Sequence, residues 1–353
     1  MRTKKVRIGD LIIGGGSPVR VQSMTNTPTE DLKRTKAQIS ALAAAGCEIV
    51  RISIPSVKAA ENIEKFKNAF PDIPLVADIH FDYRLALLSI ERGIDKLRLN
   101  PGNITAKDKV AEIVYAARRK KIPIRIGING GSLPASIKEK YHKPTAEALV
   151  AAAAEEIAYF KKLEYENIVV SLKSSDVPVT VKANRLFRER YPYPLHLGIT
   201  EAGTAIGGTV KSAVGIGILL NEGIGDTLRI SLSGDPVTEV HTGFAILREL
   251  GLRRTGLDLI ACPTCSRTEI DVAGISAQIE KKFRGMKEPL RVAIMGCIVN
   301  GPGEASEADI GIVGTKSGYV IYVNGKIIKK ITKAEGSGEA VGILSELIRK
   351  FQK

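Results

Sequence analysis

The sequence predicts an α/β protein in which a (β/α)8 TIM barrel is followed by a small α+β domain. Eight apolar runs of strand length alternate with eight stretches of helical periodicity, which is the pattern of such a barrel. The last part of the chain changes to closely spaced strands and a Gly-rich loop, which is typical of a separate α+β unit. An open doubly wound sheet is the rival architecture, but it requires fewer strand–helix units or an unusually wide sheet.

The chain begins with two short apolar runs, residues 6–8 and 11–13, around a Gly-Asp turn, which predict a β-hairpin at the barrel floor. Thr29 is the expected N-cap of the first helix, and Gly46 stands where that helix would end. The eight predicted barrel strands are Val19–Thr25, Ile49–Ile54, Leu75–His80, Lys96–Asn100, Ile122–Asn129, Asn167–Ser171, Leu195–Thr200 and Thr227–Ser231. The eight predicted helices are Thr29–Ala45, Ser56–Ala69, Arg84–Arg92, Lys107–Arg119, Thr145–Lys162, Pro178–Tyr191, Ala205–Asn221 and Val237–Leu250.

A linker is predicted at residues 251–256, Gly-Leu-Arg-Arg-Thr-Gly, so that the barrel domain would span residues 1–251 and the second domain residues 257–353. Strands are expected in the second domain at Leu257–Ala261, Leu290–Met295, Ile310–Val313, Tyr319–Val323 and Lys326–Ile331. Its helices are expected at Glu269–Phe283 and Gly338–Phe351, with a Gly-rich loop at Asn300–Gly303 and a turn at Asn324-Gly325.

Composition and charge argue against some classes of protein. No stretch of about 18 residues lacks a charged side chain, so no membrane span is predicted. The charged N-terminus does not resemble a secretory signal, and we expect the protein in the cytoplasm. The net charge of +14 fits a generic solvated surface, a nucleic-acid-binding surface, or a field that attracts an anionic substrate or acidic partner. Many basic residues stand singly at the ends of apolar strands, which favours the last interpretation over nucleic-acid binding.

Polar side chains recur near the ends of the predicted barrel strands, mostly at a spacing of two, so that they share one face. In a barrel, this is the end at which active sites are found. The residues in this layer are Arg51 with Ser53, Asp78 with His80, Arg98 with Asn100, Arg125 with Asn129, Ser171 with Lys173, Thr200 with Glu201, and Arg229 with Ser231.

The cations of this layer outnumber the carboxylates. A single strand-end cation is often only ion-paired or partly solvated, but here Arg51, Arg98, Arg125, Lys173 and Arg229 converge, with Asp78 and Glu201 as obvious partners. Unpaired buried charges are costly, so a ligand with two or more negative charges is expected. Arginine suits bidentate binding of phosphate or diphosphate. The Gly-rich segment 198–208 leads into a helix after the seventh strand, where barrels commonly hold phosphate on backbone amides.

Three cysteines belong to the second domain. Cys262 and Cys265 follow one strand as Cys-Pro-Thr-Cys, and Cys297 follows another. A redox dithiol, a zinc site and an iron–sulfur cluster all fit a CxxC pair in a reducing compartment. The dithiol leaves Cys297 without a role, and zinc commonly takes four Cys or His ligands although this domain contains no histidine. An iron–sulfur cluster is the favoured interpretation, and zinc is the main alternative.

The fourth ligand of such a cluster would come from another side chain. Glu304 is the nearest oxygen donor after Cys297, and the Gly-Pro-Gly before it is expected to bend the chain so that Glu304 returns to the metal. A weakly held fourth ligand would leave one iron able to bind substrate. Cys47 precedes the second barrel strand at the floor, where we expect it to fill a small apolar position.

Nine segments, in order along nearly the whole chain, resemble the motifs of bacterial 4-hydroxy-3-methylbut-2-enyl diphosphate synthases, the IspG/GcpE family, in its shorter two-domain form. The last two are together highly specific. The segments are Val21-Gln-Ser-Met-Thr25, Val76-Ala-Asp-Ile-His80, Arg98-Leu-Asn-Pro-Gly102, Gly127-Ile-Asn-Gly-Gly-Ser-Leu133, Ser171-Leu-Lys-Ser-Ser175, Gly198-Ile-Thr-Glu-Ala-Gly203, Arg229-Ile-Ser-Leu-Ser-Gly-Asp-Pro236, Cys262-Pro-Thr-Cys265 and Gly296-Cys-Ile-Val-Asn-Gly-Pro-Gly-Glu304.

The resemblance implies a barrel followed by a domain with one 4Fe–4S cluster per chain, in a homodimer whose cluster domain caps the partner's barrel. The implied reaction is reductive ring opening of 2-C-methyl-D-erythritol 2,4-cyclodiphosphate to the linear allylic diphosphate in the non-mevalonate (MEP) isoprenoid pathway. Two electrons would arrive singly from flavodoxin or ferredoxin, and a hydroxyl would leave as water. A zinc-containing barrel hydrolase or transferase that acts on a phosphorylated substrate is the alternative.

The same resemblance implies a role for individual residues. Glu201 would be the catalytic acid that protonates the leaving oxygen, and Asn300 would reach the substrate from the cluster side. The cluster would be held by Cys262, Cys265, Cys297 and Glu304, with Glu304 giving way to substrate. The diphosphate would be bound by Arg51, Arg98, Arg125, Lys173, Arg229 and Ser231, and the polyol would be positioned by Asp78, His80, Asn100, Asn129 and Thr200.

Overall fold

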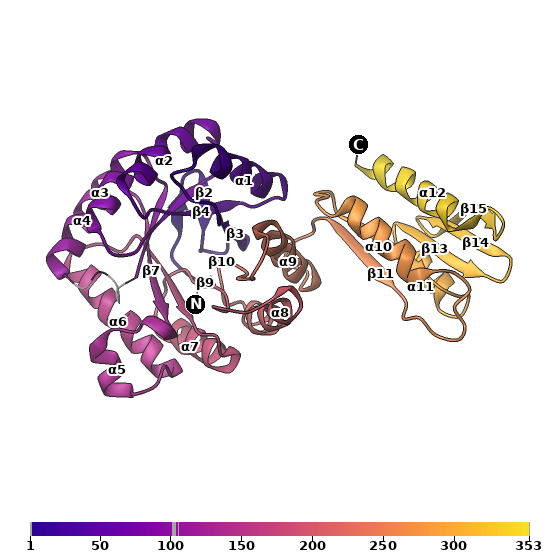
Figure 1. Ribbon diagram of the computed structural model, residues 1–353. Helices are drawn as coiled ribbons and strands as arrows, with labels where there is room; N and C mark the ends of the chain where they lie inside the picture. Colours follow the sequence, from indigo (N-terminus) through magenta and orange to yellow (C-terminus); the bar gives the residue numbers. More distant parts are fainter. Residues whose placement is uncertain (1, 101–103, 105, 353) are drawn as a thin grey trace. The chain divides into compact units, whose positions relative to one another are not determined.

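The computed structural model describes residues 2–100, 104 and 106–352, and its contacts divide the chain into two compact units, 1–253 and 254–353 (Figure 1). Each unit has an apolar core of its own. Pro101 and Gly102, which belong to one of the motifs quoted above, lie outside the described residues. None of the described helices is long and apolar enough to cross a membrane.

Unit 1 is a barrel of parallel strands surrounded by helices (Figure 1). Its strands are β3 (Arg20–Met24), β4 (Ile49–Ser53), β5 (Leu75–Ile79), β6 (Lys96–Leu99), β7 (Ile124–Asn129), β8 (Ile168–Lys173), β9 (His196–Leu197) and β10 (Thr227–Leu228). The hydrogen-bonded order is β8-β7-β6-β5-β4-β3-β10-β9. A parallel bridge between Val170 and Leu195 joins the two outer strands, so the sheet closes on itself.

The barrel helices follow the predicted alternation. They are α1 (Leu32–Ala44), α2 (Val57–Ala69), α3 (Tyr83–Glu91), α4 (Lys107–Lys120), α6 (Ala146–Lys162), α7 (Val177–Arg190), α8 (Ala205–Asn221) and α9 (Pro236–Glu249). A 3-10 turn (Gly130–Ser132) and a short helix α5 (Ala135–Tyr141), neither of them expected, lie between β7 and α6. Helix α5 spans only seven residues, which is too short for an apolar period to show in the sequence.

The expected N-cap of the first helix was wrong. Asp31, not Thr29, caps α1, and its carboxylate accepts a hydrogen bond from the Arg34 amide. Thr29 is buried, and its carbonyl accepts a hydrogen bond from the Asn62 side chain. The Asp31 amide donates to Pro28, so a turn precedes the helix and moves its start two residues along the chain.

The N-terminal hairpin consists of β1 (Val6–Ile8) and β2 (Leu11–Ile13). Its side chains form an apolar cluster with residues from the beginnings of β4, β5 and β8. The members of this cluster are Val6, Ile8, Ile13, Ile49, Val76 and Val169. The hairpin therefore packs on the floor of the barrel, opposite the end at which the strands carry their polar residues.

Unit 2 is a mixed five-stranded sheet in the order β11-β12-β13-β14-β15. The strands are β11 (Leu257–Ala261), β12 (Leu290–Met295), β13 (Ile310–Thr315), β14 (Gly318–Val323) and β15 (Lys326–Thr332), and the first three are parallel. Helices α10 (Val272–Phe283) and α12 (Gly336–Phe351) contribute to the core beside the sheet. Asn324 and Gly325 both have positive φ, as a tight hairpin turn requires.

The Gly-rich loop expected at Asn300–Gly303 is instead the beginning of a helix, α11 (Gly301–Glu307). Proline in the first helical turn loses no hydrogen bond and already has helical φ, so Pro302 favours this start. A β-carbon at Gly301 would meet Val313 Cγ1 at 2.5 Å, which shows how closely α11 packs on β13. The predicted fold class, a barrel followed by a small α+β domain, is confirmed.

Candidate functional site

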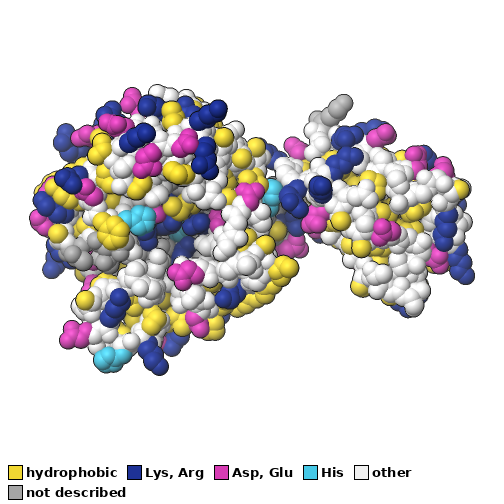
Figure 2. All heavy atoms as spheres, in the orientation of Figure 1, with side chains coloured by type: hydrophobic (Ala, Val, Ile, Leu, Met, Phe, Trp, Pro, Cys, Tyr) yellow, Lys and Arg dark blue, Asp and Glu magenta, His cyan; other side chains and the backbone are white. Residues whose placement is uncertain are grey.

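The predicted polar layer forms at the carboxyl end of the barrel strands. Across β5 and β6 Asp78 pairs with Arg98, and across β6 and β7 Arg98 pairs with Arg125. Asn129 pairs with Lys173 across β7 and β8. Parallel register therefore places these side chains side by side inside the barrel. Figure 2 shows Lys, Arg and His atoms around the hollow in the middle of the barrel unit.

Asp78 is the anionic centre of this layer and is only 1% exposed. Its carboxylate lies 3.3 Å from Arg51 Nη2, 3.1 Å from Arg98 Nη1 and 3.6 Å from His80 Nε2. Burial by itself would raise the pKa of Asp78, but the charges of Arg51 and Arg98 outweigh burial and lower it. Asp78 is therefore ionised, and it fixes the directions of two arginines.

Arg125 and Lys173 have no such partner. Both side chains are buried, and neither makes an ion pair within the described part of the chain. Nε and Nη1 of Arg125 also lack a hydrogen-bond partner there. Burial, followed by the neighbouring cations, lowers the pKa of both groups well below their ordinary values. A buried cation of this kind is stabilised by an anionic ligand.

Glu239 is a member of the site that the sequence did not reveal. It comes from α9, and its carboxylate lies 3.3 Å from both Nε and Nη2 of Arg229. It also accepts hydrogen bonds from the Ser23 hydroxyl and the Leu232 amide. Arg229 is thus held in position by a carboxylate from a helix outside the sheet. A lone glutamate in an amphipathic helix gives no signal of such a role.

Two glycines make room for the cations and were also missed as individual functional positions. A β-carbon at Gly198 would lie 2.4 Å from Lys173 Nζ and 2.6 Å from the Arg229 carbonyl. A β-carbon at Gly127 would lie 2.8 Å from Arg98 Nε. Both glycines stand two residues from a predicted site residue on the same strand face, so the period of two could have identified them.

We expect Gly198→Ala to weaken the binding of inorganic pyrophosphate by about 10-fold or more, because Lys173 must move and a charge-assisted hydrogen bond is worth roughly 1.5–3 kcal/mol. Isothermal titration calorimetry measures this loss. Gly217→Ala is the matched control, since no atom lies within 4 Å of a β-carbon there. Equal affinity of the two variants for pyrophosphate would show that binding does not depend on the space that Gly198 leaves for Lys173.

The remaining predicted residues line the rim. The Asn100 side chain donates to Ser132 Oγ at 3.0 Å, which ties the end of β6 to the 3-10 turn. Asn129, Thr200 and Ser231 are half-buried at their strand ends, and His80 is partly exposed.

Glu201 is exposed and has φ of +52°, a conformation that residues other than glycine rarely adopt. Strained backbone of this kind is concentrated at functional sites.

The cysteines of unit 2 leave the same end of its sheet. Ala261 pairs with Ile294 across the parallel strands β11 and β12, so the loops that carry the thiols are neighbours. Cys262 Sγ accepts a hydrogen bond from the Gly296 amide at 3.1 Å. The Arg267 amide is the largest of the influences that lower the pKa of the exposed Cys265 thiol. The backbone around Cys265 therefore favours the thiolate form that metal ligation requires.

The donor set fits an iron–sulfur cluster in its chemistry, because soft thiolates from neighbouring loops are the ligands that such clusters use. Among the described residues, no three His, Cys, Asp or Glu side chains stand close enough to hold a metal ion.

Asn300 and Glu304 are both exposed and belong to the first turn of α11. The Glu304 amide donates to the Asn300 carbonyl, so a helical turn, not a sharp bend, sets the direction of Glu304. The expectation of a Gly-Pro-Gly bend was wrong. Cys47 is buried, as expected, with its Sγ beside the carbonyls of Val21 in β3 and Ile49 in β4, and burial raises the pKa of its thiol to about 12.

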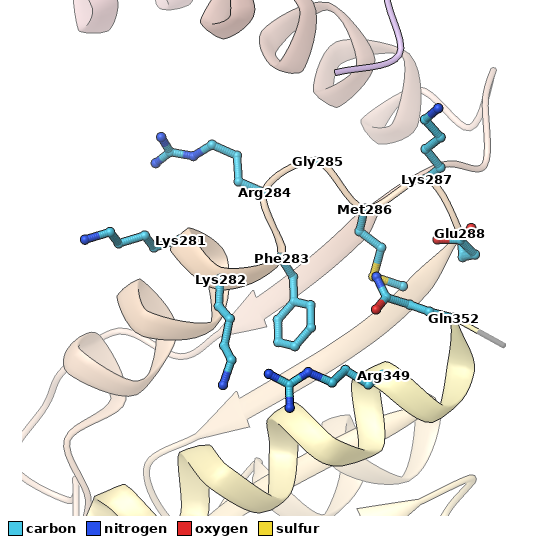
Figure 3. Close-up of a pocket in the computed structure, with 10 residues that line it drawn as sticks. All are labelled: Lys281, Lys282, Phe283, Arg284, Gly285, Met286, Lys287, Glu288, Arg349 and Gln352. Atoms are coloured by element: carbon cyan, nitrogen blue, oxygen red, sulfur yellow. The ribbon is translucent and has the colours of Figure 1, made fainter. Parts of the chain in front are cut away.

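A basic depression of about 570 Å³ lies at the other end of unit 2 (Figure 3). Lys282 and Arg349 point toward each other there, beside the Phe283 ring. It precedes β12, whereas Cys297 follows β12, so it is separate from the cysteine loops. Lys281 and Lys282 belong to the last turn of α10, and Arg349 belongs to the last turn of α12. Cations at these positions complement the helix dipole.

Comparison with family models matches both units. Residues 3–244 match the GcpE TIM-barrel domain, and residues 258–346 match the GcpE protein C-terminal domain. A relative from Geobacter sulfurreducens is 52% identical over 98% of both chains. A relative from Caldanaerobacter subterraneus subsp. tengcongensis is 51% identical over 99% of this chain and 97% of its own. Both are named 4-hydroxy-3-methylbut-2-en-1-yl diphosphate synthase (flavodoxin).

Solved structures resemble the barrel alone. Dihydropteroate synthase from Stenotrophomonas maltophilia is 13% identical and matches with a TM-score of 0.54 over 70% of this chain and 98% of its own. Type I 3-dehydroquinate dehydratase from Clostridium difficile is 14% identical and matches with a TM-score of 0.50 over 70% of this chain and 98% of its own. At these identities the likeness shows a shared fold, and the comparisons lend no support to the zinc hydrolase alternative.

Proposed function

The chain belongs to the GcpE family, and we propose that the cations in its barrel bind 2-C-methyl-D-erythritol 2,4-cyclodiphosphate for reductive ring opening. Its activity is that of an oxidoreductase of the MEP isoprenoid pathway, which forms 4-hydroxy-3-methylbut-2-en-1-yl diphosphate. The observation that carries the proposed site is the excess of buried cations over carboxylates in the barrel. A cyclic diphosphate supplies the missing negative charge.

The diphosphate is bound by Arg125 and Lys173, which lack an ion pair within the described residues, together with Arg51, Arg98, Arg229 and Ser231. Asp78 and Glu239 hold three of these arginines in position before the ligand arrives. Preorganised cations bind an anion without a large reorganisation cost. His80, Asn100, Asn129 and Thr200 surround the same hollow and position the hydroxyl groups.

Glu201 is the acid that protonates the leaving oxygen. Glu201 is exposed at the ends of the barrel strands. Its left-handed backbone lies where the chain turns from Thr200 into the Gly-rich segment before α8. An iron–sulfur cofactor is implied by the family; Cys262, Cys265, Cys297 and Glu304 would hold a 4Fe–4S cluster, which would pass electrons from the donor to the substrate, and Asn300 would contact the substrate from the cluster side. Flavodoxin is the electron donor named for the relatives, and it serves here too, with ferredoxin as its alternative.

A homodimer in which each cluster domain caps the partner's barrel is supported by the path of the chain. Arg253, the last residue of unit 1, bonds to the Val19 carbonyl and to Glu48, which lie at the beginnings of strands β3 and β4. The chain therefore leaves the barrel at its floor, whereas the polar layer is at the opposite end. Phe81 at the rim is 76% exposed, and Ile298 and Val299 beside Cys297 are 65% and 62% exposed. Closing a cap would bury such apolar groups.

The function is tested by anaerobic assay of the purified chain with reduced flavodoxin and the cyclic diphosphate, with the linear diphosphate measured by mass spectrometry. We expect brown protein with iron and sulfide, turnover, and no turnover without the donor. Arg125→Gln should abolish binding, whereas the exposed Lys120→Gln on α4 should not. A colourless protein with one zinc per chain and no reductive product would overturn the proposal and favour the zinc alternative. The same activity assay, applied to the soluble and membrane fractions of cell extracts, tests the expected cytoplasmic location.

A further inference from the structure

A second layer of polar groups lies beneath the diphosphate site and has no part in the function proposed above. Lys96 is in β6, two residues before Arg98, so both side chains point into the barrel. Its Cα pairs with Val76, a member of the apolar floor cluster. Lys96 is thus placed between the apolar floor and the cations that face the ligand.

Lys96 is shielded from solvent and makes no ion pair with any residue that the structure describes. Its side chain is 0% exposed, and Nζ has no hydrogen-bond or ion-pair partner within the described part of the chain. His196 in β9 is equally buried; its Nδ1 lies 2.8 Å from Thr227 Oγ1, and its Nε2 lacks a partner. Lysine is rarely buried without a partner, so a structural role alone does not explain this position.

The groups that act electrostatically on Lys96 are cationic or neutral bases: Arg51 and Arg125 from the surrounding strands, and His196. The layer above them adds Arg98, Lys173 and Arg229, with Asp78 and Glu239 as the carboxylates. Burial, and then the charges of Arg125 and Arg51, lower the pKa of Lys96 well below its ordinary value. With no ligand bound, the neutral form of Lys96 is therefore favoured, because it relieves the crowding of positive charge.

The ligand changes that balance. The cyclic diphosphate carries two negative charges, and ring opening cleaves the bond between a carbon and one phosphate ester oxygen. The oxygen remains on the diphosphate and adds a third negative charge, while two electrons from the donor and one proton accompany the loss of a hydroxyl as water. The charge that the barrel must neutralise thus increases on binding and again during the reaction.

We propose that Lys96 takes up a proton from solvent when the diphosphate binds, and so adjusts the charge of the barrel to that of substrate and product. This inference rests on the proposed function, because it requires the diphosphate to bind in the barrel. Lys96 does not touch the ligand in this scheme. It acts as a positioning residue, through Arg125 and the other cations above it.

The sign of the effect follows from linkage. Negative charge above Lys96 raises its pKa, so that between the free and the bound pKa the complex holds a proton that the free protein lacks. Binding is then accompanied by proton uptake, which fades at lower pH, where Lys96 is already protonated, and at higher pH, where it stays neutral even with ligand bound. His196 and Lys173 respond in the same direction, so a variant is needed to separate Lys96 from them.

The experiment is isothermal titration calorimetry of the oxidised holoenzyme with the cyclic diphosphate, without electron donor, in two buffers of different ionisation enthalpy over about pH 6 to 9. We expect net proton uptake by the wild-type protein, and a loss of about half a proton to one proton per chain in Lys96→Met. The affinity of Lys96→Met should change less than that of Gly198→Ala. Lys120→Met, the same change on the exposed surface of α4, should leave proton uptake unchanged.

The outcomes separate the two proposals. Binding without proton uptake by the wild-type protein at every pH, or uptake that is identical in Lys96→Met, would overturn the role of Lys96 while leaving the binding site in place. If Lys96→Met does not fold, Lys96→Gln takes its place in the same titration, because wild-type uptake alone does not separate Lys96 from His196 and Lys173. Absence of any binding heat would contradict the diphosphate site itself, and with it this inference.

Discussion

Cys297→Ser is expected to remove the iron–sulfur cluster and to reduce turnover below detection. Cys297 supplies one of only three thiols in unit 2, and a serine hydroxyl is a hard, poorly ionised donor that binds iron far more weakly than a thiolate. Unit 2 should stay folded, because its core is built from Ile294, Ile312 and Leu344 and does not depend on the thiol. Iron and sulfide content with visible absorbance measures the first effect, and far-ultraviolet circular dichroism measures the second.

Cys47→Ser is the matched control for this substitution. It makes the same chemical change at a buried thiol that lies 3.1 Å from the Ile49 carbonyl, in the other unit. The control should keep its full iron content and lose only stability, by roughly 1–2 kcal/mol for a polar group placed in an apolar site. A Cys297→Ser protein with as much iron as Cys47→Ser would show that Cys297 is not a ligand.

The sequence predicted the barrel strands well because buried parallel strands are nearly continuous apolar runs, and few other structures produce eight of them in alternation with helices. The polar layer was visible for the same reason: Arg98 or Lys173 is conspicuous in a run of Ile, Val and Leu. The parallel register then brings these side chains together, since residues at equal height on neighbouring strands lie side by side.

What the sequence did not reveal depends on contacts between segments that are distant along the chain. Glu239 supports Arg229 from a helix, and no local pattern links a helix glutamate to a strand arginine. Lys96 is the first residue of its strand, a position at which a lysine side chain is usually exposed to solvent. The Gly-Pro-Gly segment predicts a bend because glycine is common in turns. In the structure, the preference of proline for the first helical turn prevails, and α11 begins there.

Glu201→Gln is expected to lower kcat by about 10²–10⁴-fold, the usual contribution of a general acid, with little change in the affinity for the cyclic diphosphate. Glutamine keeps the size and hydrogen-bonding ability of the side chain but cannot deliver a proton. The cluster should be retained, because Glu201 is in unit 1 and the cysteines are in unit 2. Steady-state kinetics with reduced flavodoxin, together with calorimetry of substrate binding, separates catalysis from binding.

The backbone of Glu201 makes a control for strain essential. Its φ of +52° costs free energy that glutamine must meet as well, so any loss of activity could be attributed to a rearranged turn. Glu164 has nearly the same backbone, with φ of +53°, and is exposed between α6 and β8, away from the polar layer. Glu164→Gln therefore repeats the chemistry and the strain at a site without catalytic function. If both variants turn over at the wild-type rate, Glu201 is not the acid; if only Glu201→Gln is slow while it still binds the diphosphate, the missing proton is the cause.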